Sequence, residues 1–599
     1  MSAPSPATVA GALVTFTIKV EGKAIDSTIQ VVSVDTWQAV NRVPRARVVL
    51  YDGSAAEADF PLSDLKTFVP GQSVEIALGY DNKEVSVYRG VIVRQGLEIS
   101  QQGGSRLIID LTDEAIKMTL ARHNALFEKI KDSDLIGKLI TASGLSKDVA
   151  STNTVHEDIV QYYASDWDLM VTRAEQNGLV VMVDAGKVTV KAPDTSQAPV
   201  LTLSYGDSIL DLRTEMDAAT QYAPSAIKSS TWDIDSQKLI EAGPGSVAVS
   251  KPGNISSGEL AKVFGIKRFD QQTGATIEKT SLQDWSSAEL LKSKLAKIRG
   301  SVRFPGNSAA KLGKTVTLAG LGKRFNGNVW VSAVHHCVAN GRWTTTVELG
   351  LSAQWFAAET PHIAAPPASG QLPPIEGLQT GVVKQVAKDP GGEFRVLVNL
   401  PLLKDDAKGV WARLAGFYAS NKLGAVFYPE VGDEVVVGFM NQDPRYAVIL
   451  GSVYSKKRPP PYPPDEKNTL KALVTSSKLE ITFDEKDKVI EIKTPGKHVI
   501  RLDDKADTLT LSDANKNRIS MAKGGITIES GANLTLTAKG NITVDAKGNL
   551  AEKAAANATL EALQISQKAK TKYAANGAAT AELTSSGMLT VRGSLVKIN

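Results

Sequence analysis

The chain has 599 residues, 42% of them hydrophobic and 22% charged, with a formal net charge of +4. The length suggests about four domains, and the near neutrality argues against nucleic acid or an anionic membrane surface as the main partner. The single cysteine, Cys337, excludes an intrachain disulfide and a cysteine-rich zinc module. The first residues lack a Sec signal, and no apolar run approaches the ~20 residues of a membrane span. We therefore expect a soluble protein made in a reducing cytoplasm.

Two proline-rich stretches, residues 361–376 and 459–468, predict stiff, extended linkers. They divide the chain into an N-terminal region (1–360), a middle region (377–458) and a C-terminal region (469–599).

The N-terminal region mixes α and β patterns. Alternating or continuously apolar runs predict strands at Val14–Val20, 73–78, 85–93, 107–111, 314–319, 328–335 and 343–349, and a hairpin over 179–191. Helices are expected at 113–121, at 134–142 with Ser133 as its cap, from Ser165 to Asn177-Gly178, and at 287–299 with Ser286 as its cap. Trp167 and Trp343 fall in amphipathic patterns and are interpreted as core residues.

The middle region predicts short strands separated by turns, a pattern typical of a small closed barrel of the OB type. The expected strands are 379–387, 393–400, 410–414, 424–427, 433–439 and 446–450.

The C-terminal region has an eight-residue repeat and almost no aromatic residues. Asn recurs at 533, 541, 549 and 557, and looser alternation precedes it from Leu479 to Met521. The predicted apolar core consists of Ile526, Ile528, Leu534, Leu536, Ile542 and Val544, and the predicted turns of Gly540, Asn541, Gly548 and Asn549. One narrow apolar face cannot form a core alone, so we expect three chains to wind into a trimeric β-helix or β-prism stalk. A helix over 550–572 remains open, and strand character returns at 589–591 and 595–598.

The search for chemistry finds no catalytic set. Gly313-Lys314-Thr315 lacks the earlier glycine of a phosphate loop and is interpreted as a turn that enters a strand. His335 and Cys337 share one face of a strand while His336 points away, so at most two metal ligands converge. We therefore expect no metal and no cofactor. Asp433 and Arg445 flank turns, either as solvated residues or as an ion pair near a trimer seam.

These regions together resemble the VgrG-type spike proteins of contractile injection systems. The most specific match is in the barrel, and the hub matches more weakly through 165–193 and 324–350. The ending GMLTVRGSLVKIN is also similar to these spikes. The barrel motif consists of Pro429, Gly432, Asp433, Asp443, Pro444, Arg445 and Gly451.

The resemblance implies a mainly β fold with some α: a phage tail-hub-like α+β region, an OB barrel and a trimeric stalk. It also implies a non-enzymatic homotrimer that joins the inner tube and baseplate to the tip and pierces a target envelope when a sheath contracts. Contact with the target membrane is then transient, and no nucleic acid is bound. A PAAR-type tip protein would bind at the C-terminal end. The residues expected there are Leu595, Val596, Ile598 and Asn599.

The system itself stays open between a phage, a type VI apparatus and a released extracellular particle. The hub lacks the Phe/Tyr-Arg-His stretch usual in type VI proteins, which favours the extracellular particle. The chain stops directly after the stalk, so we expect no fused effector. The rival interpretation is a trimeric tail-fibre-like adhesin or a carbohydrate-acting tail protein. The shortage of stalk aromatics disfavours a sugar groove, and the absence of a bulky tip disfavours an adhesin.

Overall fold

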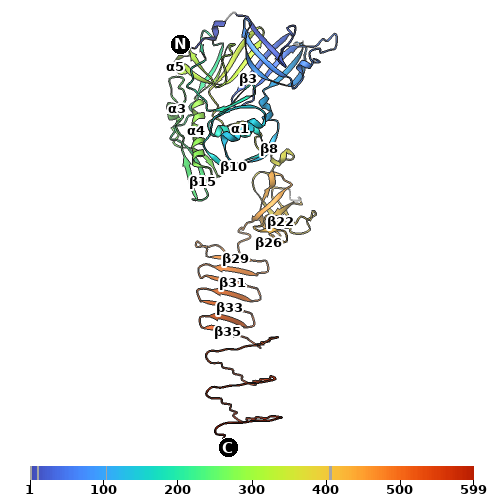
Figure 1. The fold of residues 1–599 in the computed structure, drawn as a ribbon, viewed down its shortest axis with the longest axis vertical. Coiled ribbons are helices and arrows are strands. Elements are labelled where there is room, and N and C mark those ends of the chain that lie inside the picture. The colour runs from blue at the N-terminus through green and yellow to red at the C-terminus, as the bar shows by residue number, and fades with distance from the viewer. Residues whose placement is uncertain (1–2, 10–11, 103, 404–407, 599) are drawn as a thin grey trace. The chain divides into compact units, whose positions relative to one another are not determined.

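The computed structural model describes residues 3–9, 12–102, 104–403 and 408–598. It divides into two compact units, Met1–Val453 and Tyr454–Asn599, and both are built mainly of strands (Figure 1). Within the described ranges, no helix is long and apolar enough to cross a membrane.

A 13-stranded sheet forms the largest part of the first unit. Its main path runs β14-β18-β21-β20-β3-β4-β7-β6-β5-β1-β2, and β13 joins it through β19. The strands are β1 (Val14–Val20), β2 (Lys23–Ala24), β3 (Val31–Ala39), β4 (Arg45–Tyr51), β5 (Ser73–Tyr80), β6 (Lys83–Ser100), β7 (Gly104–Thr112), β13 (Leu201–Ser204), β14 (Asp211–Met216), β18 (Ile298–Pro305), β19 (Thr315–Ala319), β20 (Gly327–Ala339) and β21 (Arg342–Leu349). The apolar alternation noted in the sequence falls on these strands, because alternate side chains enter two buried clusters.

A second layer combines helices α1 (Asp132–Ala142) and α2 (Asp166–Gln176) with two small sheets. Their strands are β8 (Arg122–Lys131) with β10 (Val155–Ser165), and β9 (Ser146–Val149), β12 (Lys187–Lys191) and β11 (Val180–Asp184). Trp167 is buried among them, as Trp343 is in the large sheet. The helix predicted at 113–121 is wrong: only a 3-10 turn, Glu114–Met118, forms there before the chain enters β8.

The two predicted caps in this layer have different outcomes. Ser165 caps α2 as predicted, since its hydroxyl oxygen accepts the backbone N–H of Asp168 at 3.0 Å. Ser133 does not cap α1, because the helix already begins at Asp132. The carboxylate of Asp132 is instead held by the side chains of Arg173 and Asn177.

A third group consists of β15 (Ile227–Asp233), β16 (Lys238–Ala242), β17 (Phe269–Thr273), α3 (Ser257–Phe264) and the long helix α4 (Lys279–Leu295). The predicted helix at 287–299 with Ser286 as its cap is wrong. Ser286 lies buried in the middle of α4, where its hydroxyl lies 2.7 Å from Ser229 Oγ and 3.0 Å from the Leu282 carbonyl. Glu289 accepts the Trp355 indole N–H at 2.9 Å instead of completing a cap. Two short helices, α5 (Gly322–Phe325) and α6 (Phe356–Glu359), complete the α-helices of the described ranges.

The barrel predicted for the middle region is confirmed. Five strands close in the order β22-β23-β24-β28-β27 around a valine-rich core. They are β22 (Gln379–Gln385), β23 (Val396–Asn399), β24 (Val410–Leu414), β27 (Glu434–Phe439) and β28 (Ala447–Ser452). The strand predicted at 424–427 is wrong: only the two-residue strands β25 (Ala419–Ser420) and β26 (Leu423–Gly424) pair there, as a hairpin outside the barrel.

The second unit begins with a seven-stranded antiparallel meander in which each strand pairs with the next (Figure 1). Its strands are β29 (Leu470–Val474), β30 (Glu480–Asp484), β31 (Val489–Lys493), β32 (Val499–Asp503), β33 (Thr508–Ser512), β34 (Arg518–Ala522) and β35 (Gly525–Glu529). Beyond β35 the chain is extended and interrupted by bends.

The cap of α2 gives a direct test of this local structure. Ser165→Ala removes the acceptor for the first turn of the helix and should lower the free energy of unfolding by about 1 kcal/mol. Ser133→Ala is the matched control, because the structure gives that hydroxyl no capping role, and it should change stability by less than about 0.5 kcal/mol. Urea unfolding followed by tryptophan fluorescence measures both. Equal losses in the two variants would contradict the assigned cap.

Candidate functional site

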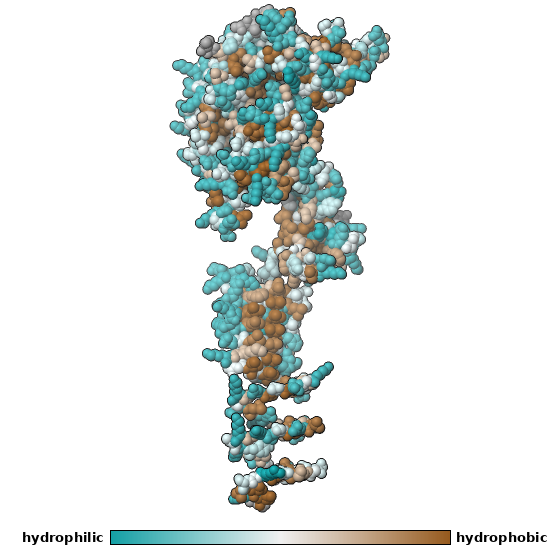
Figure 2. Space-filling view, in the orientation of Figure 1, coloured by the Kyte–Doolittle hydropathy of each residue, from teal (hydrophilic) through white to brown (hydrophobic). Residues whose placement is uncertain are grey.

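Two columns of large apolar side chains lie on one face of the meander. In an antiparallel sheet, residues directly opposite each other share a face, and here Ile492 faces Ile500, which in turn faces Leu511. The resulting column is Leu473, Ile481, Ile492, Ile500, Leu511, Ile519 and Ile528. A second column on the same face is Phe483, Ile490, Leu502, Leu509, Met521 and Ile526. Most of these side chains are exposed, and Figure 2 shows them as a continuous apolar stripe.

The opposite face of the meander carries charge pairs. Arg501 lies between Glu491 and Asp503, at 2.9 Å from each carboxylate. On the neighbouring strands Lys493 pairs with Glu480 at 2.9 Å. The backbone N–H of Ala506, followed by the Arg501 guanidinium, holds the pKa of Asp503 below its usual range, and the Lys493 ammonium does the same for Glu480. One face therefore suits water, and the other needs an apolar partner.

The eight-residue repeat continues beyond the four octads seen in the sequence. After β35, bends recur at residues 531, 539, 547, 555, 563, 571, 579, 587 and 595, with extended chain between them. The helix left open at 550–572 is therefore ruled out. Strands predicted at 589–591 and 595–598 are extended, but residues 530–598 form no ladder within their own chain. Strand pairing needs a second strand ~4.8 Å away, and successive coils of one chain do not supply it.

The structure places each of the predicted stalk core and turn residues. Ile526 and Ile528 belong to β35, and Leu534, Leu536, Ile542 and Val544 lie on the extended segments. All six are more than half exposed in the single chain. Gly540 and Gly548 occupy bends, and Asn541 and Asn549 follow them. Gly and Asn tolerate positive φ, but none of the four uses it here. A Cβ at either glycine would meet nothing within 4 Å in this chain.

The barrel motif closes two turns. Gly432 has φ 87°, and Asp433 accepts the Glu430 backbone N–H at 2.8 Å, which ends the turn that Pro429 begins. Asp443 is buried. Its carboxylate accepts hydrogen bonds from the backbone N–H of Arg445 (2.9 Å) and from a terminal guanidinium nitrogen of the same residue (2.7 Å). Gly451 lies in β28.

The ion pair of the barrel motif thus joins Arg445 to Asp443, next to Pro444 in the same turn. The sequence indicated the arginine but placed no partner in its own turn. Arg445 also reaches Gln371 Oε1 at 2.9 Å, so it links the barrel turn to the proline-rich linker. The Arg445 side chain, followed by its backbone N–H, holds the pKa of Asp443 below its usual range. A position near a trimer seam stays a prediction.

The hub residues considered for chemistry have structural partners. Gly313 has φ 72° in the turn that leads into β19, which confirms the strand-entry interpretation of Gly313-Lys314-Thr315. His336 is buried, and its Nδ1 lies 2.8 Å from Thr345 Oγ1; burial lowers its pKa to about 3. His335 and Cys337 share the other face of β20, as predicted. Burial and the neighbouring Asp35 carboxylate raise the pKa of the Cys337 thiol to about 12, so this thiol is a poor nucleophile.

Comparison with known proteins decides the family. Three family models match: the Alg8 N-terminal domain over residues 10–340, the type VI secretion system/phage-baseplate injector OB domain over 379–454, and the phage baseplate V C-terminal trimerisation domain over 489–551. The Alg8 N-terminal domain model covers more than half of the chain, so the chain belongs to that family. The OB and trimerisation models match the barrel and the stalk, as in a VgrG-like spike. The chain is 34% identical over 104 residues to the type VI secretion system spike protein VgrG4b of Pseudomonas aeruginosa. That alignment covers 16% of this chain and 13% of the relative.

Solved structures show weaker likenesses. A tail protein from Neisseria meningitidis is similar over 57% of this chain and 98% of the tail protein's chain, with 14% identity and a TM-score of 0.43. A chain of the Francisella PdpA–VgrG complex matches 86% of this chain and 88% of its own, with 10% identity and a TM-score of 0.36. The family assignment rests on the family models and not on these superpositions.

The carboxylate of Asp443 predicts a pH dependence of the VgrG-like barrel. Because the folded-state pKa is lowered, its stabilisation is complete above the ordinary pKa of about 3.9. It is lost as the pH falls through the lowered value. Asp443→Asn should therefore weaken protection of β27 and β28 at pH 7, and the difference from wild type should shrink below pH 4. Hydrogen exchange compared at each pH measures it, with the exposed Glu376→Gln as control. A difference that grows on acidification would contradict the assignment.

Proposed function

We propose that this chain is the homotrimeric spike of a contractile injection system. In this role the N-terminal hub meets the inner tube and baseplate, and the stalk pierces a target envelope when the sheath contracts. The observation that carries the proposal is the uncovered apolar face of the stalk, which continues from the meander into octads that have no ladder in their own chain. Assembly within a secretion machine accords with the type VI spike proteins to which the chain is similar.

Three copies of the chain would cover the apolar face of the stalk and would also pair its backbone groups. Three one-faced sheets set around an axis bury their apolar columns against one another and leave the three charged faces in water. The extended octads would then pair with octads of the neighbouring chains, which supplies partners for backbone groups that one chain leaves unpaired. The match to a trimerisation domain covers 489–551, which includes β31–β35 and the first two octads.

The energy available from this burial is large. Full burial of an Ile or Leu side chain contributes about 1.5–3 kcal/mol, and the two columns contain 13 such side chains, counting Phe483 and Met521. Most are roughly half covered already, so assembly would add about 1 kcal/mol each, on the order of 10 kcal/mol per chain. A gain of this size accords with a rigid needle that resists unfolding under load.

A charge at the stalk axis tests the trimer. Leu536→Lys would bring three ammonium groups together in an apolar core, at a cost of several kcal/mol per chain. Thr535→Lys is the matched control, because the neighbouring side chain of an extended segment points to the opposite face. Sedimentation and thermal unfolding should show a destabilised stalk in the first variant and a near wild-type stalk in the second. Equal behaviour of the two variants would contradict the assigned face.

The end of the stalk is proposed to bind a PAAR-type tip protein. Leu595 and Ile598 are 74% and 92% exposed, and Val596 is half exposed; Asn599 lies outside the described residues. Three such ends would form a blunt apolar face with open strand edges, which invites a partner.

Deletion of 593–599 tests this docking site. The trimer should still form, because most of the apolar columns remain, but a PAAR-type partner should no longer co-purify with the spike. A deletion of the exposed hairpin 419–424 serves as the control and should retain the partner. Tip binding that survives the loss of 593–599 would place the docking surface elsewhere.

We propose further that the spike acts mechanically and not as an enzyme. The support is the absence of a phosphate loop in the sequence and the structural partners of His336 and Cys337. Some relatives carry toxin activity by name, such as the actin cross-linking toxin VgrG1 of Vibrio cholerae, and this chain matches only 7% of that protein. Purified spike should neither clear peptidoglycan nor cleave nucleotides. Reproducible turnover that a single carboxylate or histidine substitution abolishes would overturn this proposal.

A further inference from the structure

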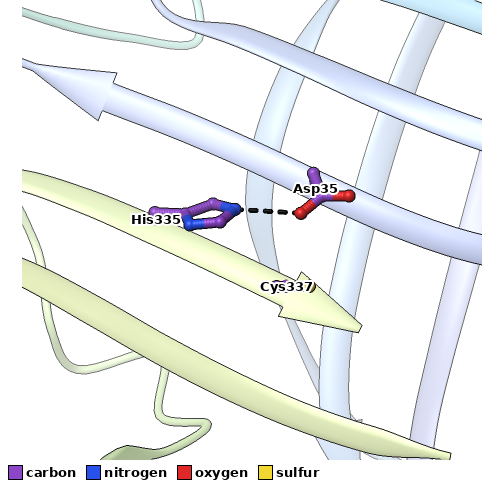
Figure 3. A group of neighbouring side chains, drawn as sticks. All are labelled: Asp35, His335 and Cys337. Carbon is purple, nitrogen blue, oxygen red and sulfur yellow. Dashed lines mark hydrogen bonds and ion pairs between the residues drawn. The ribbon is translucent and has the colours of Figure 1, made fainter. Parts of the chain in front are cut away.

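Three metal-binding side chains meet on the hub sheet. Strands β3 and β20 are antiparallel neighbours, with Cys337 directly opposite Asp35 and His335 opposite Trp37. His335 and Cys337 are two residues apart, so both lie on the face that carries Asp35. His335 Nε2 lies 2.9 Å from Asp35 Oδ1 (Figure 3). One ligand atom from each of the three residues lies within 4.8 Å of the other two.

We propose that Asp35, His335 and Cys337 bind a transition-metal ion, for which Zn²⁺ is the best fit, with water as the fourth ligand. A thiolate, an imidazole and a carboxylate are all zinc ligands, and three protein ligands plus water is an established zinc arrangement. Zinc–ligand bonds of about 2.0–2.3 Å place tetrahedral ligand atoms roughly 3.3–3.8 Å apart. The observed cluster therefore needs only small side-chain rotations to close around an ion.

The imidazole is held in position by its neighbours. The ring of Trp37 stacks on His335, with centroids 5.0 Å apart and planes inclined by 12°. On the same tryptophan, the guanidinium carbon of Arg45 lies 4.9 Å from the ring centroid. The stacked indole restricts the orientation of the imidazole ring before an ion arrives.

The charges around the cluster permit a cation. Two arginines act on it electrostatically, Arg47 on Asp35 and Arg303 on Cys337, but each forms its own ion pair. Arg47 lies 2.7 Å from Asp110, and Arg303 pairs with Asp211. Asp35 thus keeps His335 as a hydrogen-bond partner. The side chains of His335 and Asp35 are 34% and 18% exposed, so an ion can reach them from solvent.

Metal binding would exchange protons and a hydrogen bond for bonds to the ion. Zn²⁺ forms bonds to the Cys337 sulfur, His335 Nε2 and an Asp35 oxygen; the thiol proton leaves to solvent, and the neutral imidazole carries its proton on Nδ1 in place of Nε2. The hydrogen bond between His335 and Asp35 is replaced by the two metal bonds. The ion would join β3 to β20, which are 300 residues apart in the sequence at His335 and Asp35. An ion that binds only the folded hub stabilises that hub.

Cobalt substitution in the full-length protein tests this site. After treatment with a chelator, titration with Co²⁺ should produce a thiolate-to-cobalt charge-transfer band that saturates at one ion per chain and disappears when Zn²⁺ is added. Cys337 is the only cysteine, so the band can arise from no other thiol. Cys337→Ser should abolish the band, and His335→Ala and Asp35→Asn should each weaken binding about 10-fold or more. The exposed His123→Ala is the matched control and should bind as the wild type does.

The rate of thiol modification gives a second reading that needs no variant. Zn²⁺ should slow the reaction of Cys337 with a maleimide at least about tenfold, because a metal-bound thiolate is blocked. A wild-type protein that shows neither the cobalt band nor this protection has no metal site. Binding that His335→Ala and Asp35→Asn leave unchanged would also overturn the proposal.

Discussion

The second unit has an apolar face that a single chain cannot cover, and the architecture of the spike depends on it. The meander satisfies its backbone hydrogen bonds within one chain, yet two columns of aliphatic side chains remain open along its whole height. Beyond β35 the described residues also form no strand ladder within their own chain. The need for a partner chain therefore increases toward the C-terminal end. In the meander only side chains are uncovered, whereas in the octads side chains and peptide groups both are.

This gradient suits the proposed mechanical role. In the upper stalk each chain is already a sheet, so assembly would chiefly bury side chains. In the octads, assembly would also form the ladders themselves, so folding and trimerisation would be one event there. A needle built in this way has no part that one chain can release independently, which is the property that a piercing device needs.

The sequence correctly predicts those elements whose structure is determined by local residue patterns. The barrel, most strands of the large sheet and the octad register follow from period-two alternation and from Asn and Gly at fixed spacing. The predictions fail where tertiary contacts decide. Ser286 and Glu289 look like a helix start, but they lie in the middle of α4, where Ser229 and Trp355 hydrogen-bond to them. The sequence left a helix over 550–572 open, because its alanine-rich composition favours a helix locally, and the structure decides against it, since the eight-residue bend spacing continues through it.

The candidate metal cluster shows the same limit. One strand supplies His335 and Cys337, and the sequence rightly places two ligands on one face. The third, Asp35, comes from a strand that only sheet topology brings alongside. No spacing rule connects residues 300 positions apart. An acidic residue in an alternating strand near the N-terminus gives no signal of its own.

The molar mass of the full-length chain in solution tests the central claim most directly. Light scattering coupled to size exclusion at micromolar concentration should give three chain masses, unchanged on dilution, because the uncovered apolar face and the unpaired octads need two further copies. A stable folded monomer, or a closed dimer, would contradict the account.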